Sequence, residues 1–592
     1  MHLNIKSLKY LDYLILNIAM IPILIFVLDL DSLVFQYPID YSGDSLQVLM
    51  FMKMLINGDL PFYTYATSYN IGLPFGFVSA DYPSPMSTNF LFVKMLSLFS
   101  SDPVMVFNTY IIVSYFMIIN VMFFVLRRLK VNNYLAISIS LLYALVPFHH
   151  FRIGHTWYVN YFLLPIVVYY ILLLWRSKPL FFIQKYKKYK LDLSSRNLII
   201  IAILILFSLW NFYFTFFFVL LASAATISTY YYRRNRYHLY SGLMMIFFVT
   251  APFIINLVPF QLYQFEHGKN SEVANRQSFE AEVYGLRIAQ MLLPIDRHNN
   301  ALMAKIKKKY NMAPLINENS FATLGFIGTL GFLLMTLYIL FNDKILSTIK
   351  KLSILNFTAV IIATMGGYSS LFALFITSQI RGYNRISIFV STMALIVFAL
   401  AISHLMKSYS LKSITKFLIA LMILFIGTYD QVPAFMSYHK AIKLRAHLYE
   451  ADKSFIQDVE KELSSSTNNM VFQLPHMSAP ESETIHQLSE YKQVVGFLFS
   501  DKIKWSYGGI KGRESDRWIK NLFELPLEEQ VKILRSSGFN GIYIDRRGYE
   551  DKALELEANL SKILGTKPMI SPLKEKSFFK MKPTGHETYQ FD

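Results

Sequence analysis

Residues 11–44 read LDYLILNIAMIPILIFVLDLDSLVFQYPIDYSGD, an apolar stretch followed closely by two carboxylates, Asp40 and Asp44. The apolar part, 11–34, is long enough to cross ~30 Å of bilayer hydrocarbon as a helix. It has no small-residue cleavage site, so we expect a retained anchor rather than a removed signal peptide. Acidic groups beside hydrocarbon are costly to place. We therefore expect the loop that they open to carry chemistry.

The rest of the chain has the composition of a membrane protein. Of its 592 residues, 54% are hydrophobic and 16% are charged, with a mean hydropathy of +0.37, whereas soluble domains carry about 25% charged residues. Apolar runs of spanning length recur as far as residue 430. They predict eleven membrane spans, at 11–34, 103–126, 134–152, 158–175, 197–210, 213–232, 239–259, 320–341, 354–372, 386–406 and 415–429.

The basic residues indicate the orientation of these spans. The formal charge of +18 comes mainly from short loops at 127–130, 176–196, 233–236, 344–351 and 407–416. Basic loops of this kind lie on the cytoplasmic side and contact lipid headgroups. We therefore expect a cytoplasmic N-terminus, membrane lipids as partners and no nucleic acid. Because the chain has no cysteine, disulfides, thiolate catalysis and Cys-ligated metals are excluded.

Three stretches predicted to be outside the membrane are too long to be simple connectors: 35–102, 260–319 and 366–386. After residue 431 charged residues become dense and spanning runs stop. There, 469–474 and 541–545 read as strands and 527–537 as a helix that ends at Gly538. The sequence thus predicts a polytopic α-helical membrane domain over 1–430 and an extracytoplasmic α/β domain over 431–592.

Carboxylates in the first outer loop are the candidate catalytic groups. Asp44 follows Gly43, which allows a tight turn, while Asp40 is close by and Asp81 lies farther along the loop. A carboxylate at the outer membrane surface can act as a general base toward a hydroxyl group, or bind a metal. The alternative for each is a helix cap or a solvated loop residue.

Two basic groups are candidates for binding phosphate. Residues 149–155 read HHFRIGH and include Arg152 and His155, and a second group holds Arg381 and Arg385, four residues apart. Residues at that spacing share one face of a helix. Guanidinium and imidazole groups suit a phosphate. The alternative is anchoring of these side chains at the membrane interface.

Weaker candidates lie in two further regions. Glu280 and Glu282 form an acidic group in the 260–319 loop, and Trp505 and Tyr507 begin a Gly-rich turn, WSYGGIKGR. The aromatic residues are compatible with sugar or partner binding, with packing as the alternative. Glu318 stands before the eighth span and could serve as a helix N-terminal charge.

Taken together, these residues resemble a bacterial GT-C-class integral membrane glycosyltransferase, most closely the YfhO-like membrane protein family. The resemblance rests on Asp44, on residues 151–155 (FRIGH), on residues 380–386 (IRGYNRI) and on the C-terminal domain. It implies a GT-C-like membrane domain in a bacterial inner or plasma membrane. It also implies an enzyme that takes a sugar from a polyprenyl-phosphate donor and transfers it to an envelope glycan, lipid or protein acceptor.

The resemblance assigns roles to the candidate residues. Asp44 would be the base, supported by Asp40 or Asp81, and the donor phosphate would be bound by Arg381, Arg385, Arg152 and His155. The acceptor or sugar would contact Glu280, Glu282, Trp505 and Tyr507. The close DxD pair of some relatives is absent, so a divalent metal is compatible with the site but not required by it. The alternative functions are a lipid-linked sugar flippase and a non-catalytic envelope-assembly subunit.

Overall fold

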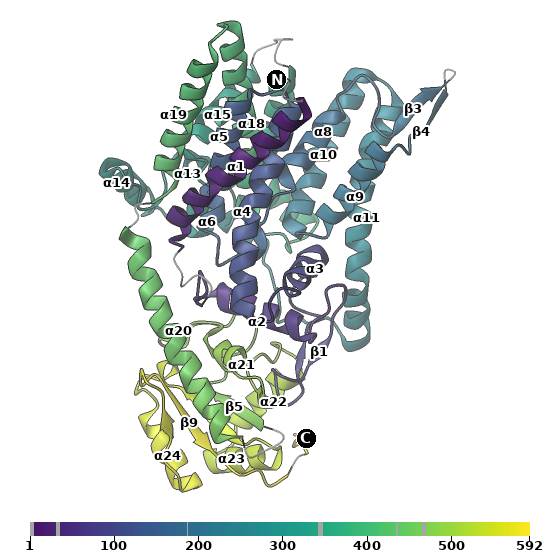
Figure 1. The fold of residues 1–592 in the computed structure, drawn as a ribbon. Coiled ribbons are helices and arrows are strands. Elements are labelled where there is room, and N and C mark those ends of the chain that lie inside the picture. The colour runs from purple at the N-terminus through teal and green to yellow at the C-terminus, as the bar shows by residue number, and fades with distance from the viewer. Residues whose placement is uncertain are drawn as a thin grey trace. The chain divides into compact units, whose positions relative to one another are not determined.

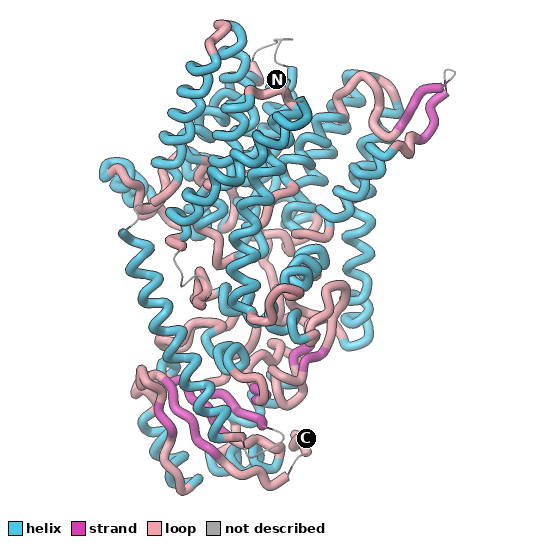
Figure 2. The backbone as a smooth tube through the Cα atoms, viewed as in Figure 1, coloured by secondary structure: helices cyan, strands magenta, loops and turns pink. Residues whose placement is uncertain are grey.

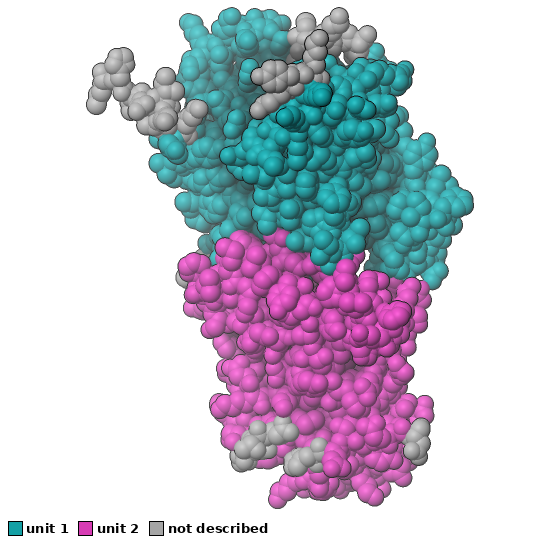
Figure 3. Space-filling view, turned by 90° about the vertical axis from the view of Figure 1, so that its right-hand side faces the viewer, with its two compact units in different colours: residues 1–31, 109–255, 276–439 teal, residues 32–108, 256–275, 440–592 magenta. Residues whose placement is uncertain are grey.

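The computed structural model describes residues 5–30, 36–185, 188–340, 347–433, 436–464, 469–585 and 587–591. The chain forms two compact units (Figure 3): residues 1–31, 109–255 and 276–439 make unit 1, and residues 32–108, 256–275 and 440–592 make unit 2. This division differs from the predicted boundary at residue 430. The predicted first outer loop, 35–102, falls in the same unit as the C-terminal residues because the two pack together.

Unit 1 is built mainly of helices (Figures 1 and 2). Its long elements are α1 (Ile5–Leu28), α4 (Pro103–Arg128), α5 (Asn133–Ala144), α8 (Leu164–Leu173), α9 (Ser195–Ser208), α10 (Phe212–Arg233), α11 (Arg236–His267), α15 (Gly325–Tyr338), α16 (Ser347–Ala363), α18 (Ser387–Ser408) and α19 (Ser413–Gln431). The ends of α4 and α11 extend into unit 2. Shorter elements are α6 (Pro147–His150), α7 (Thr156–Val159), the hairpin β3 (Phe182–Lys185) and β4 (Lys188–Leu191), α12 (Glu280–Val283), α13 (Ile288–Leu292), α14 (Ala301–Tyr310), η2 (Asn317–Ala322), α17 (Tyr368–Phe375) and η3 (Tyr383–Ile386).

Six helices in the described part of the chain are long and apolar enough to cross a membrane, which supports a multi-pass membrane protein. They are α1, α4, α10, α11, α18 together with η3, and α19. The other five predicted spans coincide with the shorter helices α5, α8, α9, α15 and α16, of 12, 10, 14, 14 and 17 residues. Residues 31–34 and 341 of the predicted spans lie outside the described residues. Eleven crossings and their orientation therefore stay a prediction.

The break between the fifth and sixth predicted spans has a local cause. Helix α9 ends at Ser208 and α10 begins at Phe212. The Asn211 side chain accepts hydrogen bonds from the backbone N–H groups of Tyr213 and Phe214, at 3.0 and 3.4 Å. These are N–H groups that the first turn of a helix leaves without an internal partner. The sequence thus forms two helices here, not one bent helix.

Glycines let helices of unit 1 approach closely. A Cβ atom on Gly331 of α15 would lie 2.0 Å from the carbonyl oxygen of Ala394 on α18, and one on Gly427 of α19 would lie 2.6 Å from Leu142 of α5. Small residues at helix contacts are typical of membrane proteins, where packing has to replace the hydrophobic effect. Residues 387–399 of α18 are buried, so this helix lies at the centre of the unit.

Unit 2 combines a mixed sheet with helices. The five-stranded sheet has the order β6-β5-β7-β9-β8, with β5 parallel to β6 and β7, and β9 antiparallel to β7 and β8. The strands are β5 (Asn469–Leu474), β6 (Ile503–Trp505), β7 (Gly541–Asp545), β8 (Met569–Ile570) and β9 (Lys576–Lys580). The other elements are α2 (Asp44–Asn57), β1 (Thr67–Ser68), β2 (Phe77–Val78), α3 (Ser87–Leu96), α20 (Met436–Glu462), η4 (Lys492–Val494), α21 (Val495–Phe499), α22 (Glu514–Phe523), α23 (Leu527–Ser536), η5 (Arg546–Gly548) and α24 (Leu554–Leu564).

The first outer loop pairs with the edge of this sheet. The backbone of Trp505 on β6 donates to the carbonyl of Asn70 at 3.0 Å and accepts from Leu73, while Gly72 donates to Tyr507 at 2.8 Å. An edge strand leaves its backbone groups unpaired, and residues 70–73 satisfy them. The predicted loop is therefore an integral part of the α/β unit.

Candidate functional site

Three irregular segments of unit 1 bring one carboxylate and two arginines together. Arg152 lies between the short helices α6 and α7, Glu318 lies on η2, and Arg385 lies on η3 immediately before the buried helix α18. Irregular backbone at membrane depth is tolerated where it is buried in protein or lines a cavity. These segments are thus suited to holding polar side chains.

Glu318 is shared between the two arginines. Its Oε2 accepts from Arg152 Nη1 at 2.7 Å, and its Oε1 accepts from Arg385 Nη2 at 3.4 Å. Asn384 completes the cluster, since its amide donates to Glu318 Oε1 at 3.3 Å and accepts from Arg152 Nη2 at 3.4 Å. The Arg152 side chain is fully buried, and those of Glu318 and Arg385 are 10% and 13% exposed.

Aromatic rings surround both guanidinium groups. Arg385 lies over the rings of Tyr158 and Tyr213, 4.5 and 4.4 Å from their centroids, and donates to the Tyr158 hydroxyl at 2.8 Å. Arg152 lies over Phe148 and Phe321, at 4.7 and 5.3 Å. Such contacts stabilise a desolvated cation without neutralising its charge.

The cluster therefore contains a surplus positive charge. Burial raises the pKa of Glu318, but the charges of Arg385 and Arg152 outweigh burial and hold that pKa well below its ordinary value. One carboxylate thus faces two guanidinium groups, and the partly exposed His155 ring lies 3.8 Å from it. Within the described residues, the buried Nε atoms of both arginines have no hydrogen-bond partner. This arrangement can accept a further anion.

Arg381, predicted to act with Arg385, has a different environment. Its Nη1 donates to Glu280 Oε2 at 2.6 Å, and its guanidinium lies 4.8 Å from the Tyr284 ring. Burial raises the pKa of Glu280, but the hydrogen bonds from Arg381 and from the Gln277 N–H, with the charges of Arg381 and Arg276, together outweigh burial, so the net shift is downward. Glu282 accepts from the Gly366 N–H at 2.6 Å and from the Ser370 hydroxyl. Both glutamates thus hold neighbouring segments of unit 1 together, and their contact with an acceptor or sugar stays a prediction.

The predicted base lies in unit 2, at the start of α2. Asp44 follows Gly43, whose φ of +46° suits glycine, and it occupies the first turn of the helix, where negative charge is favourable. Asp40 accepts from the hydroxyls of Ser42 and Ser45, both at 2.8 Å. Asp44 is half-buried and Asp40 partly exposed, so the turn presents carboxylate groups to its surroundings.

A carboxyl group absent from the sequence prediction lies near Asp44. Burial, followed by the charges of Asp44 and Glu481, raises the pKa of Glu490 to about 7, against an opposing effect of Lys511. A carboxyl that titrates near neutrality can exchange a proton with its surroundings. Glu490 thus adds a proton-accepting group to the environment of Asp44.

Asp81 is paired with an arginine of the same unit. Its two oxygens accept from Arg513 Nε at 2.6 Å and Nη2 at 3.0 Å, and its side chain is 2% exposed. Asn270 also donates to Asp81, at 3.2 Å. Because a bidentate, buried ion pair fixes the carboxylate as an acceptor, the geometry gives Asp81 a structural role.

The predicted aromatic platform is part of the core of unit 2. The Trp505 side chain is fully buried, its indole N–H donates to Ser500 at 2.8 Å, and Gly496 is in close contact with its ring. Tyr507 is 6% exposed. Neither ring presents a face to solvent, because both side chains are packed in the interior of unit 2. In the described part of the chain, no group of three or more His, Asp or Glu side chains could hold a metal ion.

Comparison with known proteins identifies the fold. No protein-family model and no curated protein sequence matches the chain. Its structure is similar to that of ArnT from Cupriavidus metallidurans bound to undecaprenyl phosphate, with a TM-score of 0.53, 9% identity, and coverage of 98% of this chain and 99% of that one. The apo state of ArnT is similar with a TM-score of 0.51 and 10% identity, and the match covers 97% of this chain and 98% of that one.

The chain has a GT-C fold. At these identities the likeness concerns the fold alone. It extends over nearly the whole of both chains, so both units of the GT-C fold have counterparts in ArnT. This agrees with the GT-C class that the resemblance predicted, whereas the eleven spans and the extracytoplasmic location of the C-terminal domain stay predictions.

The sequence prediction missed the residues that organise the cluster in unit 1. Glu318 was predicted as a helix N-terminal charge, and Tyr158, Tyr213 and Asn384 were not predicted to be functional. Asn384 lies in the quoted IRGYNRI stretch, one residue from Arg385, so its position was a usable signal. No sequence signal joined Glu318 to Arg152, because 166 residues separate them.

Proposed function

We propose that the chain is a membrane glycosyltransferase that transfers a sugar from a polyprenyl-phosphate donor to an acceptor hydroxyl. The main support is the pair of buried guanidinium groups that shares one carboxylate, Glu318, in unit 1. A buried surplus charge is costly unless a partner compensates it. A phosphate group is such a partner, and guanidinium groups bind phosphate through paired hydrogen bonds.

The fold supports the choice of a lipid-linked phosphate over a soluble one. ArnT, which shares the fold across nearly its whole length, has been solved bound to undecaprenyl phosphate. We assign the donor phosphate to Arg152 and Arg385, with His155 beside them. Arg381 is a weaker candidate, because Glu280 already neutralises its charge.

In the proposed reaction, the acceptor oxygen attacks the anomeric carbon of the donor sugar. The bond from that carbon to the phosphate oxygen breaks, and the electron pair leaves with the phosphate. Arg152 and Arg385 stabilise the charge on the leaving group. Asp44 takes the proton of the acceptor hydroxyl as general base. Asp40, held by Ser42 and Ser45, orders the turn that carries Asp44.

The finer assignments follow from the sequence motifs. We assign the chain to the YfhO-like membrane proteins and its acceptor to the bacterial cell envelope. We place the N-terminus in the cytoplasm and residues 431–592 outside. These assignments rest on the charge of the loops and on the 151–155 and 380–386 motifs.

The base is tested with the substitution Asp44→Asn in proteoliposomes that contain a polyprenyl-phosphate-linked sugar and envelope acceptors. We expect transfer to fall by about a hundredfold or more, since a general base contributes ~10²–10⁴ in rate. Asp458→Asn, an equal change at an exposed site on α20, serves as the matched control. Normal turnover by Asp44→Asn would rule out Asp44 as the base. Movement of lipid-linked sugar between leaflets without product would instead identify a transporter.

The phosphate site is tested with Arg385→Lys. Lysine keeps the charge but loses the planar paired donors, so we expect the KM for the donor to rise about tenfold. Arg381→Lys is the comparator and should change the donor KM no more than about threefold, because Arg381 is already paired. Equal effects of the two substitutions would contradict the assignment of the phosphate to Arg385.

A further inference from the structure

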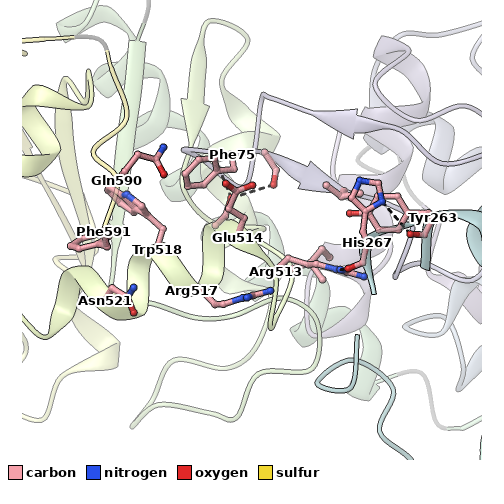
Figure 4. Close-up of a pocket in the computed structure, with 14 residues that line it drawn as sticks. Phe75, Tyr263, His267, Arg513, Glu514, Arg517, Trp518, Asn521, Gln590 and Phe591 are labelled. Atoms are coloured by element: carbon pink, nitrogen blue, oxygen red, sulfur yellow. Dashed lines mark hydrogen bonds between the residues drawn. The ribbon is translucent and has the colours of Figure 1, made fainter. Parts of the chain in front are cut away.

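A pocket of about 480 Å³ lies wholly within unit 2, separate from the residues assigned to the reaction (Figure 4). Its size is in the range of small-molecule sites. Four parts of the chain line it: residues 510–521, which lead into and run along helix α22, residues 75–78 before and within β2, the end of α11, and residues 590 and 591. A pocket assembled from four segments of one compact unit is a built feature of the fold.

One face of α22 forms the floor of the pocket. Glu514, Arg517, Trp518 and Asn521 follow the spacing i, i+3, i+4 and i+7, which places them along one side of a helix. Figure 4 shows these side chains in a row along α22. Glu514, Arg517 and Asn521 are exposed, whereas Trp518 is 4% exposed and fixes the helix to the core.

Aromatic side chains flank this polar row. Phe75 and Phe591 are half-buried and line the pocket together with Trp518. The indole N–H of Trp518 donates to the Tyr589 carbonyl at 2.7 Å, and its ring meets that of Phe591 edge-on at 5.9 Å. These contacts hold Phe591 in place beside α22.

The part of the pocket wall that belongs to the first outer loop, residues 75–78, is also fixed by hydrogen bonds and close packing. The Ser515 hydroxyl donates to the Gly72 carbonyl at 2.6 Å and accepts from the Phe75 N–H at 3.2 Å. Gly76, with a φ of +94°, leaves no room for a side chain, because a Cβ atom there would lie 2.8 Å from the Ser68 carbonyl. The pocket is therefore preformed, which reduces the entropic cost of binding.

The charges in the pocket balance. Arg513 is neutralised by Asp81, and Arg517 is accompanied by Glu514 on the same helix face. His267 stacks on Tyr263, with 4.2 Å between ring centroids, and its Nδ1 bonds to the Tyr263 carbonyl at 3.1 Å. This balance sets the pocket apart from the arginine cluster of unit 1 and favours an uncharged ligand.

We propose that this pocket binds a neutral oligosaccharide. A sugar presents hydroxyl groups that donate and accept hydrogen bonds, which planar side chains such as those of Asn521, Gln590, Arg517 and Glu514 can pair. It also presents C–H faces, which pack against aromatic rings such as those of Phe75 and Phe591. The identification of this saccharide as the acceptor rests on the proposed function. The binding of a saccharide in the pocket is independent of that function.

The test is saturation-transfer NMR on the full-length protein in detergent, with neutral trisaccharides of glucose, galactose, mannose and N-acetylglucosamine as probes. We expect at least one probe to bind, and Asn521→Ala and Arg517→Ala each to weaken it by about tenfold, the loss of a good hydrogen bond. Lys532→Ala, at an exposed position of α23 outside the pocket, is the matched control. Absence of binding by every probe, or binding unchanged by both substitutions, would overturn the proposal.

Two further measurements separate this site from the reaction. A glucuronate-containing trisaccharide should bind more weakly than its neutral counterpart, and stronger binding would overturn the proposal of a neutral ligand. Asp44→Asn should leave trisaccharide binding unchanged while it abolishes transfer. If transfer is never detected but a neutral saccharide binds at Asn521 and Arg517, the proposed function fails and the saccharide site stands.

Discussion

Two regions of the molecule, a set of ion pairs in unit 2 and the arginine cluster of unit 1, bury charge in different ways. Unit 2 contains three balanced buried pairs: Asp81 with Arg513, Asp452 with Lys576, and Arg546 with Glu557 through two bonds of 2.7 Å. In unit 1, Glu318 serves both Arg152 and Arg385. Balanced pairs fix one segment to another and leave no charge to satisfy. An unequal cluster has a remaining charge, and a bound anion can complete it.

This difference separates structural from functional charges by their partners. Arg513 and Arg385 are both arginines with little exposed surface, at 14% and 13% of the side chain. Arg513 has a carboxylate of its own, whereas Arg385 shares one. The following substitutions test whether this distinction is sound.

The largest effect on stability is expected for Glu318→Gln, which leaves two buried guanidinium groups without a carboxylate. Removal of one partner of a buried ion pair costs about 3–5 kcal/mol. Undecaprenyl phosphate should then raise the Tm of the variant more than that of the wild type, because the added phosphate replaces the lost charge. Glu528→Gln, exposed on α23, is the control. Equal ligand effects in both proteins would mean that the cluster does not bind phosphate.

A smaller loss is expected for Asp81→Asn in unit 2. The amide keeps one acceptor but leaves Arg513 uncompensated, which should cost about 2–3 kcal/mol. Transfer per folded molecule should be unchanged, and undecaprenyl phosphate should not restore the loss. Thermal unfolding and turnover are measured on the same preparation. A normal Tm with lost turnover would instead identify Asp81 as a catalytic residue.

The smallest effect is expected for Glu490→Gln and depends on pH. With its pKa raised from 4.5 to about 7, Glu490 holds more protons in the folded state than in the unfolded state between these values. The stability of the wild type should therefore fall as pH rises from about 5 to 7, by on the order of 1–2 kcal/mol after allowance for its partial exposure. Glutamine should remove this dependence. Parallel pH profiles of the two proteins would contradict the raised pKa.

Much of the fold followed from sequence patterns. The strands predicted at 469–474 and 541–545 match β5 and β7, and the predicted helix at 527–537 matches α23, which ends one residue earlier. Each of the eleven predicted spans overlaps a helix, although four of these helices, α5, α8, α15 and α16, are shorter than expected. Irregular segments adjoin several of these shorter helices. After α5, for example, residues 145–163 carry polar side chains of the arginine cluster in place of a continuous apolar run.

The sequence by itself determined where the long apolar helices lie and which side chains are chemically suited to binding phosphate. Apolar runs, basic loops and the two arginine motifs are local features, and local spacing is sufficient to recognise them. Only the tertiary structure decided which charges are paired. It assigned Asp81 to Arg513, Arg381 to Glu280, and Glu318 to two arginines at once. Pairing depends on distances between residues far apart in the chain, which local patterns do not contain.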